Sequence, residues 1–290
     1  MIVGMHRFLL HNDQIRDTSE VLLMPGQVGL MNGWGVFSTI RVFDGILFAY
    51  ERHWARMKRD AELLRVPMPA EPEQLENMLL ALVEANNARN ATLRVAIVRN
   101  RGGLFEGPAV SRDYDIIAFT TEVKDWGKGV NLGVVRQARH AASPFAGTKM
   151  LSWSFNLCWY EAAVANGFHE VVLLNERDEV SECTSANIFA AKGNVVWTPP
   201  LDSGCLPGIT RELLLHELQV PNYKLIEKTL RLNDLQDADE VFITSTTREL
   251  LGVLSIEHIT VNRNNEARLA LQSAFSQYVD AYVAKRTATV

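Results

Sequence analysis

The sequence predicts an α+β protein built of two domains. Strand-like runs followed by helix-like runs occur twice along its 290 residues, and this order favours separate α+β domains over one doubly wound sheet. A short polar, glycine-bearing break from Lys124 to Gly129 separates the two series and has the composition of a linker. We therefore expect a small N-terminal α+β domain over residues 1–123, a linker over 124–128 and a larger C-terminal α/β domain over 129–290.

Composition narrows the class of partner. Apolar residues make up 47% of the chain, charged residues 22%, and the formal net charge is −5, so no basic field is present to gather nucleic acid or an anionic membrane. No stretch approaches the roughly 18 apolar residues of a membrane span, and Gly4, His6 and Arg7 interrupt the apolar amino terminus. Three cysteines without a C-x-x-C pair fit a reducing compartment. We expect a cytoplasmic protein that acts on small molecules.

A hairpin is the clearest element of the first fifty residues. Asp44-Gly45 separates two β-prone runs, 36–43 and 46–50, and both turn residues tolerate the positive φ that such a turn requires. The period of two in a strand places Phe37, Thr39 and Arg41 on one face. For Arg41, a solvated edge charge and a site residue are both open readings.

The next element is a helix. Residues 51–65 carry an apolar stripe at helical spacing, and Pro67 ends it. Arg56 lies among three other basic residues, so composition alone predicts that it belongs to a solvated basic face. Residues 73–88 predict a second amphipathic helix.

Strands and helices alternate through the remainder. Residues 91–99 predict a strand whose Leu93, Val95 and Ile97 face the core, with Arg94 on the other side. Residues 100–115 predict a loop. The further elements that we expect are strands at 116–123, 130–135, 170–174 and 240–244, a helix at 155–166 closed by Gly167, and a helix opened by Pro207-Gly208-Ile209-Thr210.

Common cofactor motifs are missing from the sequence. It has no G-x-G-x-x-G, no G-x-x-x-x-G-K-[ST], no H-E-x-x-H and no G-x-S-x-G, and its seven histidines are scattered. We predict no metal site, and the sequence lacks the common motifs for nucleotide binding and for a serine nucleophile.

Four segments carry the functional signal. They read FAGTKMLS at 145–152, VSECTSANIF at 180–189, PGITRE at 207–212 and TSTTRE at 244–249. Alone, each is ordinary turn material. In this order and spacing they resemble the active-site segments of the fold-type IV pyridoxal-phosphate enzymes, the class IV aminotransferases, and the resemblance covers nearly the whole chain. It implies a two-domain architecture like that of D-amino-acid aminotransferase, with pyridoxal 5'-phosphate in the interdomain cleft and an active site assembled in a homodimer.

The resemblance assigns the two central roles. Lys149 stands where the family has the lysine that bonds to the cofactor. Judged from composition alone, a lysine is more often an exposed surface residue. Glu182, 33 positions later, matches the carboxylate that keeps the pyridine nitrogen protonated so that the ring accepts electrons. Without the resemblance, Glu182 reads as a turn residue.

The resemblance also assigns cofactor-binding residues. Ile209 and Thr210 open a helix, whose N-terminus suits an anion, and Thr246 follows a strand with further donors. Arg56 matches the phosphate-binding arginine of the family's His-x-x-Arg helix. Ser185 completes this group. The alternative is that the threonines are ordinary helix caps with no part in cofactor binding.

Substrate residues are implied less directly. In branched-chain aminotransferases, arginines align with Arg41 and Arg94 and meet a second carboxylate, while Phe37 and Thr247 complete the predicted substrate set. D-amino-acid enzymes use an Arg-x-His pair in the loop that corresponds to residues 99–108, and this loop has none. Which of Arg41, Arg94, Arg99 and Arg101 reaches the substrate stays open.

Two features of the sequence leave alternative functions open. Ser152-Trp153 replaces the asparagine that often follows the lysine, and residues 37–41 are close to the segment of aminodeoxychorismate lyases. The first hypothesis is an aminotransferase that moves the amino group of an L-amino acid, branched-chain or similarly apolar, to a 2-oxo acid such as 2-oxoglutarate. The alternative is a 4-amino-4-deoxychorismate lyase that releases pyruvate. A D-amino-acid transaminase and a non-catalytic homologue are less favoured.

Overall fold

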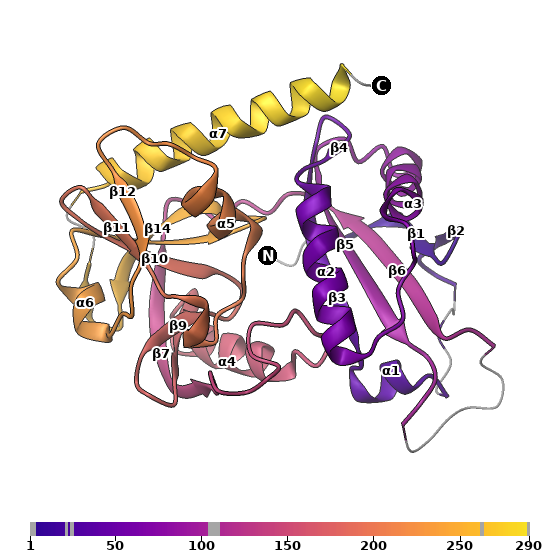
Figure 1. The fold of residues 1–290 in the computed structure, drawn as a ribbon, viewed down its shortest axis with the longest axis horizontal. Coiled ribbons are helices and arrows are strands. Elements are labelled where there is room, and N and C mark those ends of the chain that lie inside the picture. The colour runs from indigo at the N-terminus through magenta and orange to yellow at the C-terminus, as the bar shows by residue number, and fades with distance from the viewer. Residues whose placement is uncertain (1–3, 21–22, 24–25, 104–110, 262–263, 289–290) are drawn as a thin grey trace. The chain divides into compact units, whose positions relative to one another are not determined.

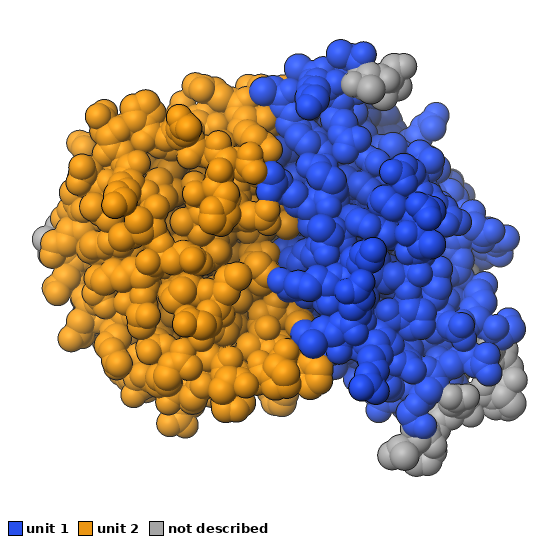
Figure 2. Space-filling view, in the orientation of Figure 1, with its two compact units in different colours: residues 1–124, 149–153, 281–290 blue, residues 125–148, 154–280 orange. Residues whose placement is uncertain are grey.

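The chain divides into two compact units. The computed structural model describes residues 4–20, 23, 26–103, 111–261 and 264–288. Unit 1 comprises residues 1–124, 149–153 and 281–290, and unit 2 comprises residues 125–148 and 154–280 (Figure 2). Helices and strands are mixed in both units (Figure 1), so the predicted α+β class is confirmed. The segment 149–153 groups with unit 1, whereas the sequence analysis places it in the C-terminal domain.

Unit 1 is built on a six-stranded antiparallel sheet with the order β2-β1-β6-β5-β3-β4. Its strands are β1 (Met5–His11), β2 (Gln14–Asp17), β3 (Gly35–Phe43), β4 (Ile46–Leu47), β5 (Ala91–Arg99) and β6 (Tyr114–Thr121). In the register of β3 and β5, Phe37 lies opposite Ala96 and Thr39 lies opposite Arg94. Because side chains alternate across a strand, these residues share one face of the sheet.

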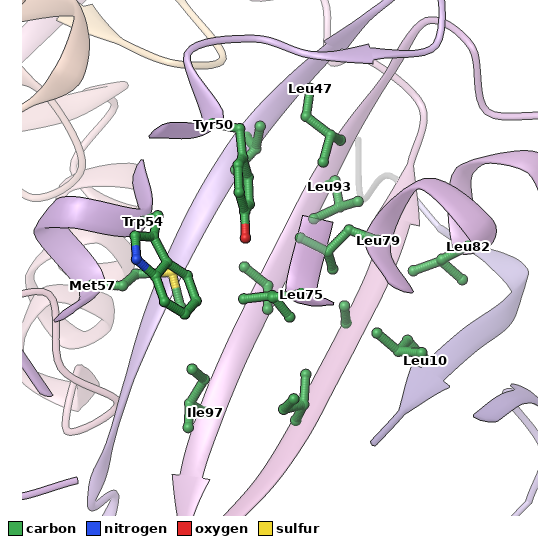
Figure 3. Packing of buried hydrophobic residues seen from close by; sticks show 14 of the residues in the cluster. Leu10, Leu47, Tyr50, Trp54, Met57, Leu75, Leu79, Leu82, Leu93 and Ile97 are labelled. Atoms are coloured by element: carbon green, nitrogen blue, oxygen red, sulfur yellow. The ribbon is translucent and has the colours of Figure 1, made fainter. Parts of the chain in front are cut away.

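The other face of this sheet is covered by two helices, α2 (Tyr50–Leu64) and α3 (Pro72–Ala85). Their apolar stripes pack on the strands, and Figure 3 shows Trp54, Met57, Leu75 and Leu79 gathered around Leu93 and Ile97. Each such side chain buried completely contributes about 1.5–3 kcal/mol. The core of unit 1 therefore fixes the position of α2 against β3 and β5. A short helix, α1 (Val28–Asn32), precedes β3.

The predicted hairpin is present, with a correction to its second strand. Asp44 and Gly45 have φ values of 50° and 85°, as the turn requires. However, β4 ends at Leu47, because Ala49 takes φ 52° and α2 begins at Tyr50. The run 46–50 has β-prone residues, but the chain turns into the helix. The helix α1 is not among the elements predicted from the sequence.

Unit 2 contains a nine-stranded mixed sheet. The order is β12-β11-β10-β13-β14-β7-β8-β9, with β15 paired to β14. Its strands are β7 (Val130–Arg139), β8 (Glu170–Asn175), β9 (Val180–Cys183), β10 (Asn187–Lys192), β11 (Val195–Thr198), β12 (Lys224–Glu227), β13 (Glu240–Ser245), β14 (Glu249–Ile256) and β15 (Ile259–Thr260). Three pairs are parallel: β7 with β8, β7 with β14, and β11 with β12.

The helices of unit 2 pack on this sheet. They are α4 (Ser154–Ala165), the 3-10 helix η1 (Leu201–Ser203), α5 (Ile209–His216), α6 (Leu232–Gln236) and α7 (Glu266–Thr287), whose last residues, from Ala281, group with unit 1. The helix α4 lies against β7 and β8, and α5 lies against β12 and β13. Glu240 at the start of β13 accepts the N–H groups of Ala267 and Arg268 and so caps α7.

Most predicted elements are present with small boundary shifts. The strand at 91–99 is found as predicted, while the strand expected at 116–123 begins and ends two residues earlier. Part of the predicted loop at 100–115, residues 104–110, lies outside the described residues. In the described part of the chain, no helix combines the length and hydrophobicity needed to span a bilayer.

Candidate active site

The main chain of Lys149 is held from two sides within unit 1. Its N–H donates to Asp60 Oδ2 at 3.0 Å, and its carbonyl accepts the N–H of Phe37 at 3.0 Å. Two residues further on, the N–H of Leu151 donates to the carbonyl of Gly35 at 2.9 Å. The lysine segment therefore lies along the first residues of β3 and is tied to α2 by a buried carboxylate.

Two cationic groups meet the ring of Phe37. Lys149 Nζ lies 4.6 Å and the Arg94 guanidinium carbon 4.1 Å from the ring centroid. The ring also makes an edge contact with Trp153, at a centroid distance of 6.1 Å. Burial lowers the pKa of Arg94 from its ordinary value, since desolvation disfavours the charged form. The structure thus brings together three of the predicted site residues, Phe37, Arg94 and Lys149. Their aromatic neighbour, Trp153, appears in the sequence analysis only as a departure from the family pattern.

A polar stripe on α2 lies next to this group. His53, Arg56 and Asp60 are buried and are spaced by three and four residues, which places them on one face of the helix. Arg56 Nη2 donates to Ser38 Oγ at 2.9 Å, and Ser38 Oγ lies 2.8 Å from His53 Nδ1. Composition alone predicts a solvated face for Arg56, and that reading is wrong because Arg56 is 8% exposed.

His53 is neutral in this environment. Its pKa is held well below the ordinary value of histidine, first by complete burial and then by the nearby charges of Arg56 and Lys149. A third positive charge here would be desolvated and repelled by two others. The positive charge next to His53 therefore comes from Arg56 and Lys149, and the histidine serves as an uncharged hydrogen-bonding partner of Ser38.

Arg41 lies elsewhere in unit 1. Its Nη1 donates to the carbonyls of Val42 at 2.7 Å and Ala91 at 2.9 Å, and its guanidinium group lies over Phe43. Along an extended strand, four residues separate Arg41 from Phe37 by about 13 Å. The structure does not bring the Arg41 side chain to the ring that Lys149 and Arg94 share.

Glu182 is the second-last residue of β9 in unit 2 and is 8% exposed. Its Oε1 accepts the Nε–H of Arg139 at 2.9 Å, and its Oε2 accepts the backbone N–H of Leu206 at 3.1 Å. An ionised carboxylate has about four acceptor positions, so both oxygens retain capacity for a further donor. Arg139 fixes the orientation of this carboxylate and was not singled out from the sequence.

Asn187 joins three of the site segments of unit 2. It pairs with Thr244 in the ladder between β10 and β13, and its Nδ2 donates to the carbonyl of Leu206 at 2.8 Å. A Cβ at Gly208 would lie 2.0 Å from Asn187 Oδ1, so this close approach requires glycine. Glu182 and Asn187 thus hold the two peptide groups on either side of Leu206, three residues before α5 begins.

The N-terminus of α5 carries two predicted residues. Gly208 is the cap residue and supplies no side-chain hydrogen bond, so the first N–H groups of the helix are not capped by that residue. Ile209 and Thr210 are both buried. Beside α5, β13 ends at Ser245, and the turn to β14 contains the half-buried Thr246 and Thr247. These segments provide backbone and hydroxyl donors in one part of unit 2.

A buried charge pair supports the turn that carries Ser185. Glu170 is fully buried and accepts the hydroxyl of Ser185 at 2.9 Å and a guanidinium N–H of Arg248 at 3.3 Å. Arg248 also donates to the carbonyl of Ser185 at 3.2 Å. Burial lowers the pKa of Arg248, while Glu170 opposes that shift. The Ser185 side chain is therefore a partner of Glu170 in this structure.

Comparison with known proteins decides the family. The family model described as "Amino-transferase class IV" matches residues 35–256, which is more than half of the chain. The chain belongs to the class IV aminotransferase family. The recognition made from the four sequence segments is confirmed.

Relatives of this class IV aminotransferase differ in named activity. A protein of Methanocaldococcus jannaschii, provisionally named a branched-chain-amino-acid aminotransferase, is 30% identical over 87% of this chain and 88% of its own length. The D-alanine aminotransferase of Bacillus licheniformis is 28% identical over 87% of this chain and 89% of its own. The aminodeoxychorismate lyase of Bacillus subtilis is 25% identical over 92% of this chain and 93% of its own.

Solved structures support the fold of this family member. The branched-chain amino acid aminotransferase from Escherichia coli superimposes with a TM-score of 0.85 over 94% of both chains, at 24% sequence identity. At that identity the likeness shows the fold alone. The predicted architecture is confirmed, and the choice of substrate is left to the site.

The class IV aminotransferase also contains site residues that the sequence analysis does not assign. They are Ser38, His53 and Asp60 in unit 1, and Arg139, Glu170, Asn187 and Arg248 in unit 2. Two signals in the sequence point to some of them. The spacing of His53, Arg56 and Asp60 matches one helical face, and Asn187 lies in the segment 180–189 that carries the family resemblance. Nothing in the local sequence pairs Glu170 with Arg248 or Glu182 with Arg139, because these contacts join segments that are distant in the chain.

Proposed function

We propose that the protein is a pyridoxal-phosphate-dependent aminotransferase that transfers the amino group of an L-amino acid, branched-chain or similarly apolar, to a 2-oxo acid such as 2-oxoglutarate. One observation carries the proposal: Lys149 Nζ and the Arg94 guanidinium meet on one aromatic ring, at 4.6 and 4.1 Å from the Phe37 centroid. An amine for the chemistry and a cation for a carboxylate thus both contact the same aromatic ring.

The residues present fit pyridoxal phosphate. Its phosphate needs concentrated donors, and unit 2 offers the α5 N-terminus, with Ile209 and Thr210, and the Thr246 turn. In unit 1, Arg56 carries a guanidinium of the kind that binds phosphate. Thr244 Oγ1 is buried in unit 2 with no hydrogen-bond partner among the described residues, which leaves one further hydroxyl near the Thr246 turn. We also assign Ser185 to the cofactor-binding residues, through the turn that carries it.

Glu182 is proposed to face the pyridine nitrogen. When bound, the cofactor supplies an aldehyde that bonds to amines and a protonated ring that accepts electrons from the substrate's α-carbon. Glu182 would hold the proton on the ring nitrogen, because a carboxylate next to a protonated base favours the charged form. Arg139 and Leu206 fix the carboxylate in one orientation.

Lys149 is proposed to bond to the cofactor and to move the proton. With cofactor and substrate bound, Lys149 Nζ would act as the general base that takes the proton from the substrate's α-carbon and as the acid that gives it back. The fixed main chain of Lys149 restricts this movement to the side-chain torsions. Acid–base catalysis by a positioned group contributes roughly 10²–10⁴-fold.

The aromatic pair and Arg94 account for both substrates. The half-buried Trp153 is proposed to offer apolar surface to the side chain of the amino donor, with the buried Phe37 packed behind it. Arg94 offers a charge to the second carboxylate of an acceptor such as 2-oxoglutarate. Thr247, in the turn after β13, is proposed to meet the α-carboxylate. Arg41 stays a predicted substrate residue, and the variants Arg41→Met and Arg94→Met test its role.

The alternative is a lyase that releases pyruvate from 4-amino-4-deoxychorismate. The Bacillus subtilis relative, whose name gives that activity, supports it at 25% identity, and residues 37–41 resemble the lyase segment. A lyase would form pyruvate without an acceptor 2-oxo acid. A D-amino-acid transaminase is supported by the Bacillus licheniformis relative but lacks the Arg-x-His pair in its loop.

The assembly and location follow from the family resemblance. We propose a homodimer or a larger homo-oligomer, because the family assembles its active site at a dimer interface, and a cytoplasmic location. Light scattering coupled to size-exclusion chromatography measures the assembly directly. A species with the mass of one chain, 32.5 kDa, would contradict it.

The site of covalent attachment tests the cofactor assignment. Purified protein is incubated with pyridoxal phosphate, reduced with borohydride, digested and analysed by mass spectrometry. We expect the cofactor mass on the peptide that contains Lys149, no such mass in Lys149→Ala, and unchanged labelling in Lys128→Ala. Attachment at other lysines with Lys149 unmodified would contradict the proposal.

A further inference from the structure

The strongest unexplained feature of the site is a buried carboxylate behind the lysine. Asp60 has 0% exposure and its Oδ2 accepts the backbone N–H of Lys149 at 3.0 Å. Neither the family resemblance nor the sequence analysis assigns it a role. We propose that Asp60 is a positioning residue that fixes the backbone of Lys149 and thereby the direction of its amine, an inference that rests on the proposed function.

Asp60 is itself held in place. The guanidinium of Arg59 donates to its Oδ1, with Nε at 2.9 Å and Nη2 closer, so the two carboxylate oxygens have separate partners. The helix that carries it is anchored by its apolar stripe, including Met57 and Ala61 of the unit 1 core. The acceptor offered to Lys149 is therefore fixed to a rigid element and not to a loop.

The carbonyl side of Lys149 is held as well. Phe37 donates its N–H to that carbonyl, and Met150 forms an antiparallel bridge with Val36. Asp60 on α2 and β3 thus hold opposite sides of one residue. Since both peptide groups are fixed, only side-chain torsions can move Lys149 Nζ from its place over the Phe37 ring.

The ionic character of Asp60 strengthens this contact. A hydrogen bond to a charged acceptor is roughly twice as strong as a neutral one, and an unsatisfied buried N–H costs about 1–3 kcal/mol. The residues before Lys149 form turns, and Thr148 N–H donates to Phe145. Without Asp60, the last residue of this turn series loses its tie to α2.

A purely stabilising role for Asp60 makes a different prediction. If the carboxylate only satisfies a buried N–H, its loss lowers the melting temperature and leaves the reaction of Lys149 unchanged well below melting. If it positions the lysine, the rate at which Lys149 takes up cofactor falls. A displacement of about 1 Å in a reacting group can cost on the order of 10²-fold.

The test uses Asp60→Asn and a matched control. The asparagine amide serves only one partner as acceptor and presents a donor to the other. Asp115→Asn makes the same change at a carboxylate of unit 1 that is 1% exposed and paired with Arg112 at 3.0 Å. Full-length protein stripped of cofactor is mixed with pyridoxal phosphate; the lysine nitrogen bonds to the aldehyde carbon with loss of water, and borohydride reduces that bond to a stable secondary amine. The labelled Lys149 peptide is measured against time.

We expect Asp60→Asn to slow labelling roughly ten- to a hundredfold and Asp115→Asn to label within about twofold of the wild type. Arg59→Ala alters an exposed side chain and removes the partner of Oδ1; it is expected to slow labelling two- to tenfold, and it decides the matter if Asp60→Asn does not fold. A wild-type rate of labelling in Asp60→Asn overturns this inference alone. If only Arg59→Ala folds, a wild-type rate in that variant does the same. Equal slowing in Asp115→Asn also overturns it. Wild-type protein that takes up no cofactor at Lys149 overturns the proposed function and this inference together.

Discussion

The guanidinium of Arg94 lies 4.1 Å from the ring centroid of Phe37, the same ring that Lys149 Nζ approaches to 4.6 Å. Arg94 is on β5 and Phe37 is on β3, and the register of the two strands places them on one face. In the proposed function, Arg94 binds a carboxylate of one substrate, and Trp153, whose ring contacts Phe37, meets the apolar side chain of the other.

Removing the Arg94 charge is expected to impair the dicarboxylate acceptor selectively. In Arg94→Met, KM for 2-oxoglutarate should rise roughly ten- to a hundredfold, because a hydrogen bond to a charged group is worth about 1.5–3 kcal/mol. KM for an apolar amino donor should change less than threefold. Steady-state kinetics with each substrate varied in turn measures both.

Arg41→Met is the matched variant on the neighbouring strand. Its guanidinium bonds backbone carbonyls of Val42 and Ala91, so we expect a lower melting temperature with both KM values close to wild type. An acceptor KM that rises in Arg41→Met and not in Arg94→Met would reverse the assignment.

Glu182→Gln should preserve cofactor binding and reduce turnover. The amide can still accept the N–H of Leu206, but the charge that holds the ring-nitrogen proton is lost. We expect kcat to fall roughly 10²–10³-fold, as for the removal of an electrostatic stabiliser.

The control for this change is Glu240→Gln, which alters a carboxylate of 3% exposure that caps α7. It should lower the melting temperature and leave kcat within about twofold. Equal kcat values in Glu182→Gln and wild type would show that Glu182 does not act on the cofactor.

The approach of Asn187 to Gly208 predicts that an added methyl group weakens cofactor binding. In Gly208→Ala, the new Cβ would lie 2.0 Å from Asn187 Oδ1, so the side chain or the start of α5 must shift. Displaced N–H groups at the helix N-terminus should raise Kd for pyridoxal phosphate roughly tenfold, a loss of about 1.4 kcal/mol. Fluorescence titration measures this. Gly4→Ala, whose Cβ meets nothing within 4 Å, is the control and should retain the wild-type Kd.

His53 should make the stability of the protein fall in mild acid. Its folded pKa is well below its ordinary value, so below about pH 6.5 the unfolded chain binds a proton that the folded chain does not. The free energy of unfolding then decreases by up to about 1.4 kcal/mol per pH unit. In His53→Asn this contribution is absent, so the melting temperature should depend less steeply on pH between about 6.5 and 5. Parallel curves for the two proteins would mean that His53 is protonated in the folded state.

Much of the fold can be predicted from local patterns. The strand at 91–99 alternates over most of its length, and the Asp44-Gly45 turn has residues that accept positive φ, so both are found where predicted. The second hairpin strand is shorter than expected, since Ala49 adopts a left-handed conformation that β propensity does not reveal. The helix α7 is not assigned, although Ala267, Leu271, Phe275 and Val279 recur every four residues and are buried.

The site is less predictable than the fold because its contacts join distant segments. Lys149 and Glu182 are recognised through their sequence context, and Arg56 through its resemblance to a helix motif. Composition alone misplaces Arg56 on a solvated face, because helical spacing does not say which polar residues are covered by neighbouring strands. The contact of Asp60 with Lys149 spans 89 positions in the chain, and no local pattern predicts it.

The most direct test of the account is amino-group transfer in a single half-reaction. Purified protein saturated with pyridoxal phosphate is mixed with one L-amino acid at a time, without a 2-oxo acid, and the visible absorption of the bound cofactor and the 2-oxo acid product are measured together. The account predicts that an apolar L-amino acid, such as a branched-chain one, removes the visible band and yields about one 2-oxo acid per chain, and that Lys149→Ala yields none. A band that no L- or D-amino acid removes, together with pyruvate released from 4-amino-4-deoxychorismate, would contradict the aminotransferase and establish the lyase.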